Sequence, residues 1–99
     1  MMGLQEHENR LIRGRILKLL RSVDFNHIAA DVLVSTLKGC GHQLTITSLL
    51  GVLQYLVDKD YVEIQEATFE GVGTVTTARI TAKGVDLLEE SVSDPGVAL

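Results

Sequence analysis

The stretch that decides the fold runs from Leu44 to Leu88 and reads LTITSLLGVLQYLVDKDYVEIQEATFEGVGTVTTARITAKGVDLL. Its first part predicts a helix, because Thr45 is a suitable N-cap and apolar residues then recur at intervals of three and four. The apolar stripe consists of Ile46, Leu49, Val52, Leu53 and Leu56. We therefore expect a helix that ends near Asp58 and buries one face.

The next part alternates between apolar and polar residues, which is typical of half-exposed strands. One strand is expected from Tyr61 to Thr68 and a returning strand from Thr74 to Ile80. Glu70-Gly71-Val72-Gly73 lies between them, and glycine tolerates the positive φ angles of tight hairpins. Thr81 is then a candidate N-cap for a last helix. The apolar stripe of that helix is Val85, Leu88 and Val92.

The segment before Leu44 supplies two more helices and a short strand. The first helix is expected from Leu4 or Gln5 to Ser22, with an apolar stripe at helical spacing. That stripe is Ile12, Ile16, Leu19, Leu20 and Val23. Ile28 predicts a short strand, and a second helix follows that stops at Gly39-Cys40-Gly41, since glycine is common just past a helix end. The residues that mark this second helix are Val32, Leu33, Thr36 and Leu37.

Helix, short strand, helix, helix, hairpin and helix is the order of the winged helix-turn-helix fold. The sequence thus predicts an α+β, mostly α fold, with residues 1–94 as a single winged-helix domain and residues 95–99 as a C-terminal tail. A plain helical bundle is the alternative, but it leaves the alternating segment 61–81 unexplained. Winged-helix domains most often hold DNA, so the pattern also suggests an activity.

Composition bounds the class of protein. The 99 residues fit one domain, and with 45% apolar but only 4% aromatic residues the core must be aliphatic. No apolar run approaches the roughly 18 to 20 residues of a membrane span, so we expect no membrane partner. A single cysteine, Cys40, agrees with a reducing compartment, and we expect a cytoplasmic protein.

Several short stretches carry a resemblance to known proteins. The segment from Glu8 to Leu20, the pair Gly41-His42 and the sequence Asp94-Pro95-Gly96-Val97 resemble small winged-helix proteins of Mu-like bacteriophages and prophages. More broadly, the segments 58–62 and 80–84 are similar to signatures of the ArsR, PadR and MarR families of bacterial regulators. The resemblance to those families implies a dimeric, DNA-binding transcription factor.

Charge argues against simple DNA binding. The chain has a net charge of −4, whereas DNA-binding domains usually present a basic surface to the phosphates. Residues 1–22 hold five basic and two acidic side chains, and the remainder holds four basic and eleven acidic. The basic first helix is either a solvated face or a contact surface.

The helix predicted over 45–58 would carry any base readout, because the second helix of a helix-turn-helix enters the major groove. The residues expected on its reading face are Thr45, Thr47, Ser48, Leu50, Gly51 and Gln54. Thr, Ser and Gln can hydrogen-bond bases, and Gln can bind adenine through two bonds. Contacts to the DNA backbone are expected from Lys38, His42 and Arg79.

The same helix lacks the residues that usually strengthen DNA binding. No arginine or lysine lies between Gln43 and Val57, and the wing carries three glutamates against one arginine. Acidic side chains near phosphates weaken binding by repulsion. Two hypotheses follow, since a fold alone does not decide function. The chain is either a regulator that binds double-stranded DNA as a dimer or a winged helix that contacts another protein.

A homodimer is expected from apolar residues outside the core stripes. These are Leu11 and Leu17 on the first helix and Leu87 on the last helix. A twofold dimer through those helices would also space two recognition helices for half-sites. The alternative is a monomer with ordinary exposed leucines.

Catalytic and metal sites are not expected. His7, His27 and His42 lie in different predicted elements, and with one cysteine no zinc-ligand spacing exists. The glycines 71 and 73 lack the strand-to-helix context of a phosphate-binding loop, and no motif marks a nucleophile. The sequence therefore predicts no enzyme, no metal and no cofactor.

Overall fold

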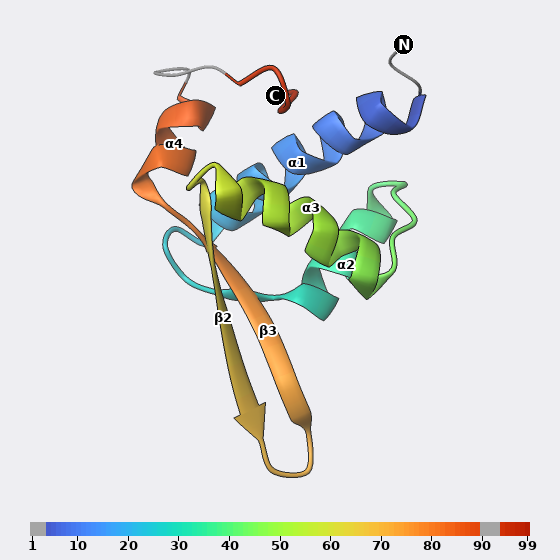
Figure 1. The fold of residues 1–99 in the computed structure, drawn as a ribbon, viewed down its shortest axis with the longest axis vertical. Helices are drawn as coiled ribbons and strands as arrows, with labels where there is room; N and C mark the ends of the chain where they lie inside the picture. Colours follow the sequence, from blue (N-terminus) through green and yellow to red (C-terminus); the bar gives the residue numbers. More distant parts are fainter. Residues whose placement is uncertain (1–3, 90–93) are drawn as a thin grey trace.

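The computed structural model describes residues 4–89 and 94–99 and confirms the predicted order of elements. The elements are α1 (Leu4–Ser22), β1 (Ile28–Ala29), α2 (Ala30–Gly39), α3 (Ile46–Asp58), β2 (Val62–Phe69), β3 (Gly73–Ile80) and α4 (Ala82–Leu88). The helices gather at one end of the molecule, and the hairpin of β2 and β3 projects from them as a long wing (Figure 1). This is the α+β, mostly α winged-helix architecture that the sequence predicts.

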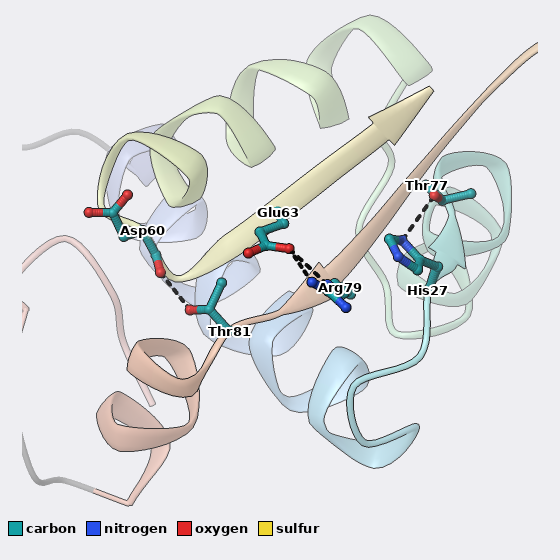
Figure 2. Close-up of polar contacts among 6 residues, drawn as sticks. All are labelled: His27, Asp60, Glu63, Thr77, Arg79 and Thr81. Carbon is teal, nitrogen blue, oxygen red and sulfur yellow. Dashed lines mark hydrogen bonds and ion pairs between the residues drawn. The ribbon is translucent and has the colours of Figure 1, made fainter. Parts of the chain in front are cut away.

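Threonine begins two of the helices, as predicted. The Thr45 hydroxyl accepts a hydrogen bond from the Ser48 amide at 3.0 Å, and the Thr81 hydroxyl accepts one from the Gly84 amide at 3.2 Å. Thr81 also donates its hydroxyl proton to the Asp60 carbonyl at 2.5 Å (Figure 2). These bonds satisfy amides that a helix start leaves unpaired. The Asp60 bond also ties the start of α4 to the turn after α3.

The three strands form one antiparallel sheet in the order β1-β3-β2. The hairpin register runs from Val62 opposite Ile80 to Phe69 opposite Gly73, and the short β1 adds Ile28 opposite Ala78. Gly71 and Gly73 have φ angles of 81° and 97°, which confirms the predicted glycine turn. The register brings Glu63 opposite Arg79, a pairing that matters for the charge of the wing.

The core is aliphatic and lies where α1, α2 and α3 meet the base of the hairpin. Its most deeply buried side chains are Ile16, Leu17, Leu20, Leu33, Leu37, Leu49, Leu53, Leu56, Val62, Ile80 and Leu87. Tyr61 is the one buried aromatic side chain in the described part of the chain. Burying a leucine or isoleucine contributes about 1.5 to 3 kcal/mol, so this cluster is the main source of stability.

Two of the predicted dimer residues are part of this core. Leu17 and Leu87 are 0% and 1% exposed, so the inference that they lie outside the buried stripes was wrong. The reason is that α1 is in contact with α2, α3, α4 and β3, so its apolar side chains are enclosed by several elements. Leu11 is half-buried and retains some exposed surface.

The stripe on α4 and the start of the stripe on α3 also differ from prediction. On α4, Gly84 and Leu87 are buried, whereas Val85 and Leu88 are half-buried, and Val92 lies outside the described residues. A Cβ at Gly84 would lie 2.5 Å from the Tyr61 carbonyl oxygen, so the glycine allows α4 to approach closely. Ile46 was expected in the core but is 43% exposed, because it lies at the first position of α3.

Residues 94–99 lie against the helices. Val97 is 7% exposed, and the Ala98 amide donates to the Arg10 carbonyl at 3.0 Å. The Arg13 side chain donates to the Gly96 carbonyl at 2.9 Å. These residues, which the sequence assigned largely to a tail, therefore pack against α1.

The Asp94 carboxylate anchors this segment to two tyrosines. The hydroxyls of Tyr55 and Tyr61 each donate to one of its oxygens at 2.9 Å, and the Gly96 amide donates at 2.7 Å. Burial opposes ionisation of Asp94, but the bonds from Gly96, Tyr61 and Tyr55 outweigh it and lower the pKa of the carboxyl. Burial and the bond to Asp94 raise the pKa of Tyr61 to about 12.

Replacing Gly84 by alanine should destabilise the protein, because the new Cβ would lie 2.5 Å from the Tyr61 carbonyl oxygen and 2.7 Å from Ile80 Cγ1. Overpacking costs about 1 to 3 kcal/mol, which exceeds the gain of up to about 1 kcal/mol in helix propensity. The matched control is Gly51→Ala, where a Cβ meets nothing within 4 Å and only the propensity gain applies. Urea unfolding compares the two, and a G84A variant as stable as G51A would contradict the close approach.

The Asp94 anchor should make stability depend on pH at both ends. Because the folded pKa of Asp94 is lowered, its contribution is complete above the unfolded pKa of about 3.9 and is lost as the pH falls through the folded pKa. Because the folded pKa of Tyr61 is raised, its contribution is complete below pH ~10 and is lost as the pH rises toward about 12.

The measurement is the free energy of urea unfolding as a function of pH for the parent and for Asp94→Asn. As the pH falls, the free energy of unfolding should decrease less for the variant than for the parent. Asp86→Asn is the control, since Asp86 is exposed on α4 and makes no hydrogen bond or salt bridge within the described ranges. A D94N profile that matches the parent between pH ~2 and 5 would argue against the anchor.

Candidate nucleic-acid interface

The side of α3 that faces away from the core is exposed. Thr47, Ser48, Leu50, Gly51 and Gln54 are exposed and lie opposite the buried stripe of α3. In Figure 1, α3 lies at the surface of the helical end, in front of α1. The helix is therefore available to a partner along the face that the sequence assigned to DNA, although its role in binding stays a prediction.

Several polar groups on this face already have partners. The Thr45 hydroxyl caps the helix and donates to Ser48 Oγ at 3.1 Å. Gln54 Nε2 donates to Asp58 Oδ1 at 2.8 Å. A two-bond contact from Gln54 to adenine would require that bond to break. In the N-terminal half of α3, Thr47 keeps a side-chain hydroxyl with no hydrogen bond within the ranges 4–89 and 94–99.

His42 does not lie where a phosphate contact would need it. Its side chain is buried at 6% exposure and lies between Arg15 and Glu8, so the predicted contact to the DNA backbone was wrong. Arg15 Nη1 lies 2.5 Å from His42 Nε2, and Nδ1 lies 3.2 Å from Glu8 Oε1. Since a guanidinium only donates, Nε2 must accept, and Nδ1 carries the proton that points to Glu8.

The same arginine positions the turn that precedes α3. Arg15 Nη1 also donates to the Cys40 carbonyl at 3.3 Å. Two residues of α1, Glu8 and Arg15, thus hold both the backbone and the one buried histidine of the turn between α2 and α3. His42 of the Gly41-His42 pair, quoted in the sequence for a resemblance, therefore ties the turn between α2 and α3 to α1.

Two further cations of α1 also have partners within the molecule. Arg13 stacks over the ring of Tyr55, with 3.9 Å from its guanidinium carbon to the ring centroid. Arg21 pairs with Asp24 at 2.9 Å. Lys18 is exposed on the same helix. The basic character of the first helix therefore supports intramolecular contacts, in addition to forming a solvated face.

The wing carries little free positive charge. Arg79 donates from Nε and Nη2 to Glu63 Oε2 at 2.8 and 2.6 Å, across the β2–β3 pair (Figure 2). His27 Nδ1 lies 3.1 Å from Thr77 Oγ1 and links the segment before β1 to the wing (Figure 2). The predicted phosphate contact from Arg79 must therefore compete with Glu63. Lys38, the third predicted backbone contact, is exposed on α2 and forms no salt bridge among the residues that the structure describes.

A hollow between the helices and the wing brings apolar side chains to the surface. A separate cleft of about 450 Å³ lies between α1 and α3, and the hollow beside the wing has a volume of about 310 Å³. The second is lined by Ala30, Asp31, Ile46, Val72, Thr74, Val75 and Thr76. Val72 is 74% exposed. The sequence reasoning missed Ile46 as a surface residue, although its place directly after the N-cap was a usable signal.

No family model matches the sequence, and no curated protein is detectably similar to it. Among solved structures, a proposed transcriptional regulator from Thermoplasma acidophilum, TA0346, aligns with a TM-score of 0.72 at 21% identity over 85% of this chain and 79% of that one. Bacillus subtilis PadR, solved in complex with operator DNA, aligns with a TM-score of 0.68 at 18% identity over 87% of this chain and 50% of that one.

A PadR-family transcriptional regulator from Eggerthella lenta aligns with a TM-score of 0.61 at 20% identity over 81% of this chain and 70% of that one. The chain has the winged-helix fold of PadR-type regulators. At these identities the likeness establishes the fold alone.

Within 4–89 and 94–99, no three His, Cys, Asp or Glu side chains gather closely enough to hold a metal ion. In that same part of the chain, no helix combines the length and apolarity needed to cross a membrane.

Replacing Arg15 by methionine should destabilise the protein. The variant keeps an unbranched, flexible side chain but removes the donor to the buried His42 and to the Cys40 carbonyl. Leaving a buried polar group without its partner costs about 1 to 3 kcal/mol of unfolding free energy. The control is Lys18→Met on the same helix, where an exposed substitution should change stability by no more than about 0.5 kcal/mol. Equal urea midpoints for R15M and K18M would show that the contact does not hold the turn.

Proposed function

We propose that this chain is a DNA-binding transcriptional regulator of phage or prophage type that binds duplex DNA as a dimer, with α3 in the major groove. The observation that carries the proposal is the free face of α3 in a helix-turn-helix whose turn is held by Arg15 and His42. The phage assignment rests on the sequence resemblance of residues 8–20, 41–42 and 94–97. Residues on the reading face are Thr45, Thr47, Ser48, Leu50, Gly51 and Gln54.

Phosphate contacts contribute less here than in a basic winged helix. Lys38 is exposed, and Arg79 is shared with Glu63. Two cations per chain, or about four per dimer, would give a slope of about −3 to −4 in a plot of log affinity against log salt. Such a slope is shallow for a sequence-specific regulator, so base contacts must supply more of the affinity.

The dimer would use α1 and α4, because these helices keep partly exposed apolar side chains. Leu11 on α1 and Val85 and Leu88 on α4 are half-buried. A twofold pairing of these surfaces buries them and leaves both α3 helices outward. Of the leucines expected at this interface, Leu11 alone remains a candidate.

The test is a titration of the purified chain with random duplex DNA at ~50 mM and ~200 mM salt, read by fluorescence anisotropy. Binding that weakens with salt along the shallow slope supports the proposal. Sedimentation of the complex gives its stoichiometry, for which two chains per duplex site are expected. No binding at ~50 mM would refute DNA binding.

A second set of titrations measures the contribution of the wing to DNA binding. Glu63→Gln removes one negative charge and also frees Arg79 for phosphate, so it should strengthen binding by several-fold. Glu66→Gln is the matched control, since Glu66 is an exposed residue of β2 that is absent from the salt bridges of the described chain. E66Q should strengthen binding less than E63Q, and an equal gain would mean that Arg79 does not reach DNA.

The second candidate function is a protein-interaction module. The hollow beside the wing favours it, because Ile46, Val72 and Val75 offer apolar surface next to the acidic Asp31. A partner with apolar and basic side chains would complement this surface. Absence of DNA binding at the lower salt, together with an intact fold by circular dichroism, would favour this alternative.

A further inference from the structure

We infer that Ile46 and Leu50 read the methyl groups of thymine, so that the chain prefers duplex sites rich in A·T pairs. The inference rests on the proposed function, since it names the class of DNA sequence that the α3 face would select. It begins from the exposure of two branched aliphatic side chains on a surface where polar residues are usual.

The two side chains occupy one face near the start of α3. Ile46 is 43% exposed and Leu50 is 37% exposed, although both are large apolar residues. They are four residues apart, so they lie one turn apart on the same side, separated by about 6 Å along the helix axis. In a helix-turn-helix it is the N-terminal part of this helix that meets base edges.

Polar readout from this half of the helix is limited. Guanine is most often read by Arg or Lys, and no residue of α3 is basic. The hydroxyls of Thr45 and Ser48 are engaged with each other in the cap. Gln54, the residue suited to adenine, donates to Asp58 and lies in the C-terminal half. Thr47 remains as the one hydrogen-bonding side chain beside Ile46 and Leu50 without a bond in the described chain.

Thymine offers the chemistry that fits this surface. The major-groove edges of the four bases present donors and acceptors, and the C5 methyl of thymine adds an apolar group to that pattern. Contact between this methyl and Ile46 or Leu50 removes apolar surface of both partners from water. A guanine or cytosine edge at the same place would instead leave polar groups facing aliphatic carbons without hydrogen bonds.

The experiment selects sites from a random duplex library with the full chain and then removes methyl groups one at a time. The selected pool should be enriched in A·T pairs. Replacing a contacted thymine by deoxyuridine should weaken binding by about fourfold, the loss expected for one buried methyl group. For Ile46→Ala or Leu50→Ala, binding should already be weaker, and the deoxyuridine replacement at the matching position should have no further effect.

Phe25→Ala is the control variant, because Phe25 is also an exposed apolar residue, at 52%, but lies in the segment between α1 and β1. It should keep the full response to deoxyuridine. Duplex binding with no A·T enrichment, or with no effect of deoxyuridine, would overturn this inference while DNA binding stands. An equal deoxyuridine effect in the parent and both alanine variants would assign the preference to DNA shape and also overturn it. No selection of any duplex would remove both proposals.

Discussion

Leu49, Leu53 and Leu56 of α3 are fully buried in a core that α1, α2 and the base of the hairpin complete, and the remaining architecture depends on this contact. Because the chain has few aromatic residues, the core consists of aliphatic side chains that pack against one another and not around a large aromatic ring. Because the three leucines lie on one stripe, their burial also determines which residues of α3 face outward.

A second constraint is the way the cations are used. Arg13 stacks on Tyr55, Arg15 contacts His42, Arg21 pairs with Asp24 and Arg79 pairs with Glu63. Each contact gives the cation a partner within the molecule, and the Arg79–Glu63 pair offsets positive charge on the wing. Through Arg13 and Arg15, the basic first helix stabilises the domain and the turn before α3.

The exposed face of α3 is neutral and partly apolar, and a partner must complement that character. Exposed aliphatic residues normally favour contact with protein or with the methyl groups of DNA, and the face of α3 is compatible with either kind of contact. The hollow between Ile46 and Val72 adds to that character. A regulator built in this way would depend more on the shape and methyl pattern of its site than on phosphate attraction, which would make its binding less sensitive to salt.

The sequence by itself determined the elements, because their signals are local. Helical spacing, alternation in the strands, the caps at Thr45 and Thr81 and the glycine turn each act within a few residues. The outward residues of α3 followed from the same periodicity, apart from Ile46 at the helix start. The local signals were thus enough for the winged-helix order.

Only the tertiary structure decided the burial and the contacts of residues whose partners are distant in sequence. Leu17 and Leu87 are buried because several elements surround α1, and His42 is held by Glu8 and Arg15, which lie 34 and 27 residues away. Asp94 meets Tyr55 and Tyr61 from the far end of the chain. Periodicity assigns a face to each residue along one element, but it carries no information about which other element covers that face.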